Sequence, residues 1–164
     1  MKTRSIQMGF KNWETPPDFF AKLDEEFHFT LDAAASHENA LCGTYCTVDG
    51  TFGWKGGVQL SALDGLTYSW GEHRVFCNPP YDSSLYQWVQ KAAMREAELS
   101  VLLLPPSIDT KWFHEFIWDD GGIGITPKWR RGVTGHFLPK RLRFWRDGKP
   151  GESPRAGNLL VVFR

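Results

Sequence analysis

Short apolar runs alternate with stretches of helical periodicity between residues 74 and 126, and this order restricts the possible folds more than any other feature. The apolar runs are Arg74–Cys77, Ser100–Leu104 and Ile123–Thr126. Residues 84–99 and 109–118 separate them, and their apolar side chains recur at helical spacing. Strands separated by helices are typical of a parallel sheet with crossover connections. We therefore expect an α/β fold with a doubly wound, mostly parallel sheet.

The two ends of the chain do not follow this alternation. Residues 1–11 show no hydrophobic period and are expected to form a flexible arm, which leaves residues 12–164 as a single domain. Near the other end, Arg141–Trp145 and Asn158–Phe163 are strand-like runs separated by a connection rich in Gly, Pro and Ser. We expect these two runs to form an antiparallel strand pair.

A helix start is predicted at Thr15–Asp18. Thr15 is a suitable N-cap, proline suits the first helical position, and Asp18 completes a capping box. Aromatic and aliphatic side chains then recur at helical spacing as far as Phe27. Residues 27–32 are rich in β-forming side chains, so we expect a short strand that ends at Asp32.

The stretch Asn78-Pro79-Pro80-Tyr81, called the elbow below, directly follows the run Arg74–Cys77. Proline fixes φ and cannot donate to a sheet ladder, so the strand is expected to end here in a stiff polar turn. Ligands of open parallel sheets bind outside the carboxyl ends of the strands. Asp32, the elbow and Pro105-Pro106 all follow predicted strands, and we expect them to converge on one crevice.

The elbow has the groups that are needed to activate an amine on a nucleic-acid base. The lone pair of such an amine is delocalised into the ring, and a site that accepts both N–H hydrogens makes the nitrogen more pyramidal and more nucleophilic. The side-chain oxygen of Asn78 and the carbonyl of Pro79 are two such acceptors, and neither must titrate near neutral pH. Tyr81 offers a flat face for an extruded base, an interaction worth about 1–3 kcal/mol. The alternative is a strand-ending turn without a chemical role.

Charge is unevenly distributed along the chain although the net charge is zero. Residues 12–72 hold ten acidic and two basic side chains, whereas residues 126–164 hold ten basic and two acidic ones. A basic region rich in aromatic residues is one expected footprint of a nucleic-acid surface, and a solvated face is the alternative. The residues expected along a phosphate track are Lys128, Arg130, Arg131, Lys140, Arg141, Arg143 and Arg146. Recognition is expected from the loops of residues 106–157, with a second subunit of a homodimer as a further contributor.

Cysteine and apolar content argue against several other classes of protein. Three cysteines without a signal peptide favour a reducing compartment, and we expect a cytoplasmic protein. The longest apolar runs, residues 101–104 and 159–163, are too short to span a bilayer. His37, Cys42, Cys46 and Cys77 lack the spacing of a standard zinc site, so no metal is expected.

Several short motifs occur in one order and carry a resemblance to a known family. They are Trp13–Pro17, Leu31–Ala34, Asp64–Leu66, the elbow, Leu104–Pro106, Arg141–Phe144 and Leu159–Phe163. Together they resemble the small phage and prophage DNA adenine-N6 methyltransferases of the Dam type, from about residue 12 to the end. The resemblance implies a compact class I methyltransferase-like fold, S-adenosylmethionine as the cofactor and double-stranded DNA as the partner.

The resemblance also implies roles for individual residues. Asn78, Pro79, Pro80 and Tyr81 would hold and activate the amino group of a flipped adenine. The cofactor-binding residues would be Thr15, Pro16, Asp32, Ala33, Ala34 and Asp64. The first cofactor loop departs from the usual pattern, because alanines follow Asp32 where glycines are common. For Asp32 and Asp64, a capping or turn role is the alternative.

Two other functions remain open at this level. Protein glutamine methyltransferases use the same four-residue elbow, so the chemistry alone does not fix the substrate. A phage DNA-binding module without catalysis would use the elbow only as a turn. The basic, aromatic C-terminal part of the chain favours DNA over protein as the substrate.

Overall fold

The computed structural model describes residues 13–50, 52–55, 58–122, 126–152 and 156–164. The N-terminal half of this part contains α1 (Pro17–Phe27), β1 (Leu31–Ala35), β2 (Thr44–Thr47), β3 (Phe52–Lys55), β4 (Val58–Ser61) and β5 (Arg74–Cys77). The C-terminal half contains α2 (Leu85–Ala93), β6 (Leu99–Leu104), the π-helical turn η1 (Phe113–Ile117), β7 (Trp118–Asp119), β8 (Lys128–Trp129), β9 (Val133–Phe137), β10 (Trp145–Arg146), β11 (Lys149–Pro150) and β12 (Leu159–Phe163).

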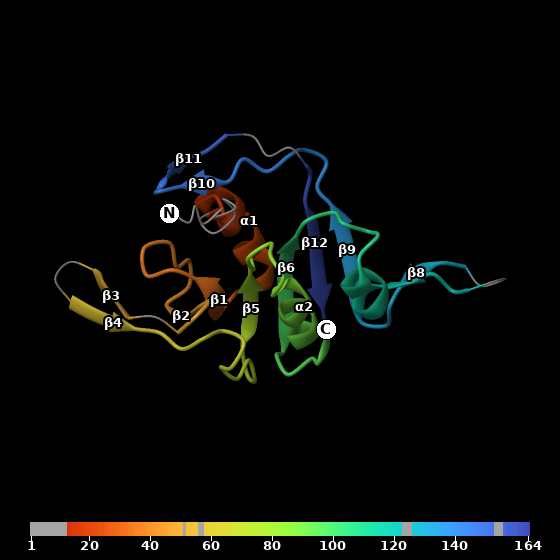
Figure 1. Cartoon of the computed structure of the whole chain (residues 1–164), viewed down its shortest axis with the longest axis horizontal. Coiled ribbons are helices and arrows are strands. Elements are labelled where there is room, and N and C mark those ends of the chain that lie inside the picture. The colour runs from red at the N-terminus through yellow and green to blue at the C-terminus, as the bar shows by residue number, and fades with distance from the viewer. Residues whose placement is uncertain (1–12, 51, 56–57, 123–125, 153–155) are drawn as a thin grey trace, which may run out of the picture.

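A six-stranded sheet forms the centre of the described structure, in the order β2-β1-β5-β6-β12-β9 (Figure 1). Neighbouring strands from β2 to β6 are parallel, and β12 is antiparallel to both β6 and β9. The prediction of an α/β protein with a mostly parallel sheet is therefore confirmed. The hairpins β3–β4 and β7–β8 project from opposite ends of this sheet (Figure 1).

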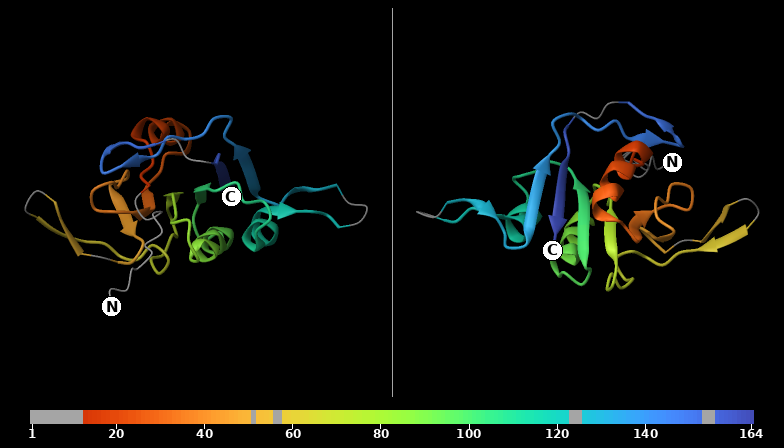
Figure 2. Two further views of the ribbon diagram at one scale, coloured as in Figure 1. Left: turned by 45° about the horizontal axis from the view of Figure 1, so that its top comes forward. Right: turned by 180° about the vertical axis from the view of Figure 1, so that it is seen from behind.

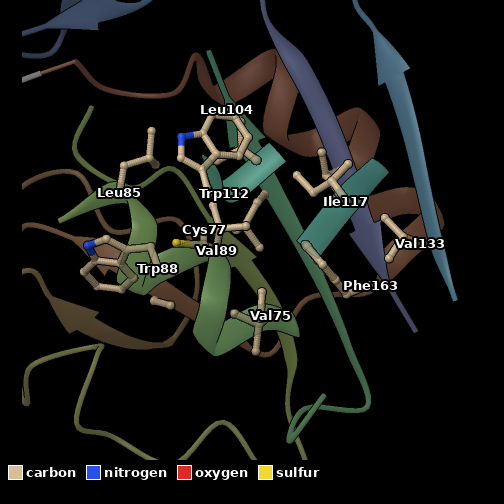
Figure 3. Close-up of a cluster of buried hydrophobic side chains, with 14 of the residues drawn as sticks. Val75, Cys77, Leu85, Trp88, Val89, Leu104, Trp112, Ile117, Val133 and Phe163 are labelled. Atoms are coloured by element: carbon tan, nitrogen blue, oxygen red, sulfur yellow. The ribbon is translucent and has the colours of Figure 1, made fainter. Parts of the chain in front are cut away.

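Helices cover both faces of the sheet, because its central strands are apolar on both sides. All six residues of β6 are buried. Leu102 and Leu104 pack in one cluster with α2 and η1, whereas Val101 and Leu103 pack in another with α1. Figure 2 shows α1 and α2 on opposite faces, and Figure 3 shows Trp88 and Val89 of α2 near Val75 and Cys77 of the sheet.

The first helix begins one residue later than predicted. Pro16, and not Thr15, is the N-cap, and the cap makes no side-chain hydrogen bond, so the predicted capping box is wrong. Two successive prolines explain the shift, because Pro16 holds φ −58° and ψ 130° and its carbonyl accepts from Phe20 N at 3.0 Å. Thr15 is instead buried ahead of the helix.

The strand predicted for residues 27–32 is also displaced. Phe27 is the last residue of α1, and His28 ends the helix in the left-handed region at φ 50°. The strand is Leu31–Ala35, so Asp32 is its second residue and not its carboxyl end. The buried aromatic side chain of Phe27 extends the helix, and the alanines, which lack turn-forming side chains, extend the strand.

Local signals also set the limits of the other predicted elements. Arg74–Cys77 is confirmed as β5, and the run from residue 100 is confirmed as β6, which begins at Leu99. The helix predicted over 84–99 ends at Ala93, shortly before Arg95 turns into the left-handed region at φ 56°. The helix predicted over 109–118 contains the π-helical turn η1.

The predicted C-terminal strand pair is wrong. β12 does not pair with Arg141–Trp145 but lies between β6 and β9, while β10 pairs with β11. β9 is hard to recognise in the sequence, because Gly135 lies at its centre and only Val133 of its side chains is buried. That glycine is required because an added Cβ would overlap the ring of Trp129.

Some expectations concern segments outside these ranges. The arm predicted for residues 1–11 lies outside the described residues, as do residues 123–125 of the strand predicted at Ile123–Thr126. In the part of the chain that is described, no helix has the length and apolarity to cross a membrane.

Gly65 offers a test of how tightly β1 is packed. Its N–H donates to Thr47 O at 2.9 Å, and an added Cβ would overlap the Ala33 carbonyl and the Trp88 ring. We expect Gly65→Ala to lower the free energy of unfolding by about 1–3 kcal/mol or more, measured by urea denaturation. Gly43→Ala is the matched control, because nothing lies within 4 Å of its added Cβ. Equal stability of the two variants would contradict this packing.

Candidate active site

The elbow lies at the carboxyl edge of the parallel strands. It follows β5 directly, and the neighbours of β5, β1 and β6, run in the same direction. Cys77 is fully buried, whereas Asn78 and Tyr81 are half-buried. The sheet thus anchors the start of the elbow in the core and presents the side chains that follow at its rim.

The amide of Asn78 is held in one orientation by the main chain of Trp13. Asn78 Nδ2 donates to Trp13 O at 3.1 Å. A carbonyl only accepts hydrogen bonds, so the amide must present its nitrogen to Trp13 and its oxygen to the other side. Within the described residues, no hydrogen bond reaches Asn78 Oδ1 or the Pro79 carbonyl. Both oxygens are therefore left as uncharged acceptors at the edge of the sheet.

The Trp13 carbonyl is itself fixed by the C-terminal part of the chain. Glu14 N donates to Trp145 O and Trp145 N donates to Glu14 O, both at 2.9 Å. The Trp13 ring packs edge-on against Phe144 at 5.6 Å between centroids. Figure 2 shows the β10–β11 hairpin beside α1. The strap, defined as residues 13–15, thus connects this hairpin to the elbow.

Sequence reasoning missed the contact between the strap and the hairpin, because Glu14 and Trp145 are more than a hundred positions apart. One signal for the hairpin was present, since Asp147-Gly148 is the favoured sequence of a two-residue β-turn between strands. Asp147 and Gly148 have φ of 51° and 70° and connect β10 to β11. Gly148 N also donates to Glu14 Oε2 at 3.2 Å, which anchors the turn to the strap.

A small cavity lies between the strap, β1 and the elbow. It is lined by Trp13, Glu14, Thr15, Asp32, Ala34, Ala35, Asn39, Leu41, Phe76 and Asn78. Four predicted site residues, Thr15, Asp32, Ala34 and Asn78, therefore meet at one place. Asn39 was missed, and its Oδ1 accepts from Ser36 N at 2.6 Å, which closes the loop after β1.

Asp32 is a buried carboxylate at this cavity. It is 4% exposed, and its Oδ2 accepts from Leu41 N at 3.1 Å. Burial raises the pKa of Asp32 from 3.8 to about 6, and hydrogen bonds from Leu41 and Ala34 partly oppose the shift. The ion pairs of the described residues do not include Asp32. A buried anion that lacks a cationic side chain beside it is suited to a positively charged ligand.

The other predicted cofactor residues lie outside the lining of this cavity. Ala33 is fully buried in the cluster that packs under α2, and Pro16 caps α1. Asp64 Oδ1 accepts a hydrogen bond from Leu66 N at 2.8 Å within its own turn. The main chain of Asp64 forms a parallel bridge to Thr47 of β2. The pair Pro105-Pro106 follows β6 at the same edge of the sheet but does not line the cavity.

Tyr81 is held at its hydroxyl. Tyr81 Oη donates to Leu103 O at 3.1 Å and accepts from Asn158 Nδ2 at 3.3 Å. Its ring packs against the cluster that also contains α2. Asn158 was not predicted as a site residue, and its position just before β12 gave no local signal of this contact.

The predicted phosphate track is divided into two groups of exposed residues. Lys128, Arg130 and Arg131 lie beside the β7–β8 hairpin, whereas residues 140–146 lie next to the strap. Two of the arginines also donate hydrogen bonds to main-chain carbonyls. Arg130 Nη2 donates to His114 O at 2.7 Å, and Arg143 Nε donates to Gly151 O at 2.6 Å.

Cationic and apolar side chains alternate around Arg143 without forming a strand. Leu142 and Phe144 pack into the cluster beneath α1, while Arg141 and Arg143 are exposed. The exposed cations of residues 140–146 therefore lie on the outside of a segment whose apolar side chains support the strap.

Two comparisons relate this chain to known proteins. Residues 5–124 match the family model described as DNA N-6-adenine-methyltransferase (Dam). A protein of Escherichia phage T1 with the name DNA N-6-adenine-methyltransferase is 26% identical over 167 residues, which cover 93% of this chain and 62% of the phage protein. The chain thus spans about three-fifths of the length of that relative. Because the family model matches most of its length, the chain belongs to the Dam family of DNA N-6-adenine-methyltransferases.

Proposed function

We propose that the protein transfers a methyl group from S-adenosylmethionine to N6 of an adenine extruded from double-stranded DNA. One observation carries the proposal. The Trp13 carbonyl holds the amide nitrogen of Asn78, which leaves Asn78 Oδ1 as an acceptor at a cavity that Asp32 also lines, and the Pro79 carbonyl follows directly in the chain. Membership of the Dam family agrees with this chemistry.

The lining of this small cavity has the charge and polarity that would suit part of the proposed cofactor. When bound, S-adenosylmethionine supplies an electrophilic methyl group on a positively charged sulfonium. Asp32 would offset positive charge of the cofactor, and Thr15 and Asn39 would add polar contacts. The small side chain of Ala34 would allow the close approach that glycine provides in other methyltransferases. Roles for Pro16, Ala33 and Asp64 rest on the resemblance alone.

The elbow would activate the substrate without a titrating base. Asn78 Oδ1 and the Pro79 carbonyl would each accept one N–H of the adenine amino group, which moves the nitrogen lone pair out of conjugation with the ring. Pro79 and Pro80 restrict the backbone, so the two acceptors need little reorganisation. The Tyr81 ring would provide the stacking surface for the extruded base.

The fold, the cellular location and the oligomeric state are also part of the proposal. We infer one methyltransferase domain over residues 12–164 with a doubly wound, class I methyltransferase-like sheet. The antiparallel β12 within an otherwise parallel sheet and the helices on both faces support this inference. We also infer that the enzyme acts on DNA in the cytoplasm of a bacterial host, with a second subunit of a homodimer contributing to recognition.

We propose that the exposed cations beside the strap contact DNA phosphates. In Lys140→Ala/Arg146→Ala, the slope of log affinity against log salt concentration is expected to fall by about two, because each phosphate contact contributes about one. Fluorescence anisotropy with a duplex at several salt concentrations measures this slope. Lys111→Ala is the matched control, since Lys111 lies beside Tyr86 and Glu115 on the η1 side of the sheet. An unchanged slope in the double variant would contradict the assignment.

Transfer of tritium from labelled S-adenosylmethionine tests the proposed function. The purified chain is incubated with duplex DNA that lacks adenine methylation and, separately, with a protein extract. We expect nuclease-sensitive label in N6-methyladenine. Label found only in protein would favour a glutamine methyltransferase. Salt-sensitive DNA binding without calorimetric heat from S-adenosylmethionine would favour a non-catalytic module.

A further inference from the structure

Asn158 reaches the elbow because β12 is antiparallel to its neighbours in the sheet. β12 is antiparallel to β6, and its first residue, Leu159, pairs with Leu104, the last residue of β6. The residue just before β12 therefore lies at the edge where the parallel strands end. Its main chain is fixed there, since Leu138 N donates to Asn158 O at 2.9 Å. From this position Asn158 Nδ2 donates to Tyr81 Oη at 3.3 Å.

The amide of Asn158 is poorly explained by packing alone. The residue is 3% exposed, and its Oδ1 is buried without a hydrogen-bond partner among the described residues. A buried carbonyl oxygen that lacks a donor destabilises the fold, and an apolar side chain of similar size would remove that penalty. An asparagine at this position therefore points to a role other than stabilising the fold.

The contact it makes restrains the Tyr81 ring. The phenol oxygen is bonded to Leu103 O on one side and Asn158 Nδ2 on the other, so a swing of the ring about the Cα–Cβ bond, which would move the hydroxyl, breaks two hydrogen bonds. Burial raises the pKa of Tyr81 well above its usual value, so the hydroxyl remains protonated and keeps both contacts at neutral and mildly alkaline pH.

We propose that Asn158 is a positioning residue of the reaction, which holds the Tyr81 ring in the orientation that receives the target base. This inference rests on the proposed function, because it gives Asn158 a role through the stacking surface of the elbow. A ring that is fixed before the base arrives loses less entropy when stacking occurs, which favours the productive position of the amino group.

Asn158→Leu separates this role from a structural one. The variant keeps the number and branching of the side-chain heavy atoms, removes the buried polar group and deletes the contact to Tyr81 Oη. We expect kcat for tritium transfer to unmethylated DNA to fall about tenfold, with KM for S-adenosylmethionine changed less than twofold. We also expect the thermal midpoint of unfolding to be equal or higher. Ser100→Ala is the matched control, because Ser100 is also buried and polar but pairs with Phe163 at the opposite end of β12.

A double-variant comparison tests whether Asn158 acts through Tyr81. Tyr81→Phe keeps the ring and removes the hydroxyl, so Tyr81→Phe/Asn158→Leu should have the kcat of the more impaired single variant. With 2-aminopurine at the adenine that sequencing identifies as methylated, Asn158→Leu should give brighter fluorescence than the wild type, because a less ordered Tyr81 stacks less well.

The outcomes distinguish this inference from the function on which it rests. A wild-type protein that transfers no label to DNA would overturn the proposed function and the role of Asn158 with it. An active wild type with an equally active Asn158→Leu variant would overturn the role of Asn158 alone. Losses of kcat that multiply in the double variant would likewise exclude action through the Tyr81 hydroxyl.

Discussion

Replacement of Asn78 by alanine is expected to lower kcat by about 10²–10³-fold, the range found when one preorganised hydrogen-bonding group is removed from an active site. The variant lacks the side-chain acceptor, so an adenine amino group keeps only the Pro79 carbonyl as a partner and its lone pair stays conjugated. The dissociation constant of S-adenosylmethionine should change by less than about threefold, because Asp32 and Thr15 remain at the cavity. Steady-state tritium transfer and calorimetry measure the two quantities.

Asn39→Ala is the matched control for this prediction. It removes another amide from the lining of the same cavity, but the oxygen of that amide is bonded to Ser36 N and does not belong to the elbow. We expect Asn39→Ala to affect binding of the methyl donor more than kcat. Normal turnover in Asn78→Ala, or an equal loss of kcat in both variants, would contradict the role assigned to Asn78.

Replacement of Asp32 by asparagine is expected to weaken binding of S-adenosylmethionine about 30-fold or more, because a buried charge that faces a cationic ligand is removed. The affinity of the wild type should also fall as pH is lowered through about 6, where Asp32 becomes protonated. Calorimetry across this pH range measures both effects. The variant should show little pH dependence between pH 5 and 8, and an equally steep decline in its affinity would show that another group is responsible.

The same substitution should stabilise the protein without its ligand. Folding raises the pKa of Asp32 from 3.8 to about 6, so the stability contributed by the protonated group is fully present below 3.8 and is lost as pH rises through about 6. A shift of this size corresponds to about 3 kcal/mol when the group is fully buried. The amide that replaces the carboxyl group in Asp32→Asn cannot ionise, so the variant does not lose stability as pH rises. Its free energy of unfolding should exceed that of the wild type by up to about 3 kcal/mol above pH 7 and by little near pH 4. Urea denaturation at both pH values provides the comparison, and lower stability of the variant at pH 8 would contradict the assignment.

Features encoded by adjacent residues could be predicted from the sequence. β5 and β6 were recognised because each is a short apolar run that turn-forming residues end, and the elbow follows one of them. Asn78 could be placed at the sheet edge because parallel strands share the edge at which they end.

Features that depend on contacts between distant residues could not be predicted. The orientation of the Asn78 amide depends on Trp13, and Trp13 depends on a bridge between Glu14 and Trp145. The contact between Asn158 and Tyr81 requires β12 to lie beside β6, whereas local pattern suggested Arg141–Trp145 as its partner. Asp32 was placed at the end of a strand because the run of β-forming side chains stops there, although the alanines that follow continue β1.

The most direct test of the account is a crystal structure of the protein with a duplex and sinefungin, an analogue that carries an amine in place of the transferable methyl group. We predict that sinefungin lies in the cavity beside Asp32 and that the amino nitrogen of an extruded adenine lies about 3 Å from both Asn78 Oδ1 and the Pro79 carbonyl. A complex in which the analogue binds away from this cavity, or in which the adenine amino group contacts neither oxygen, would contradict it.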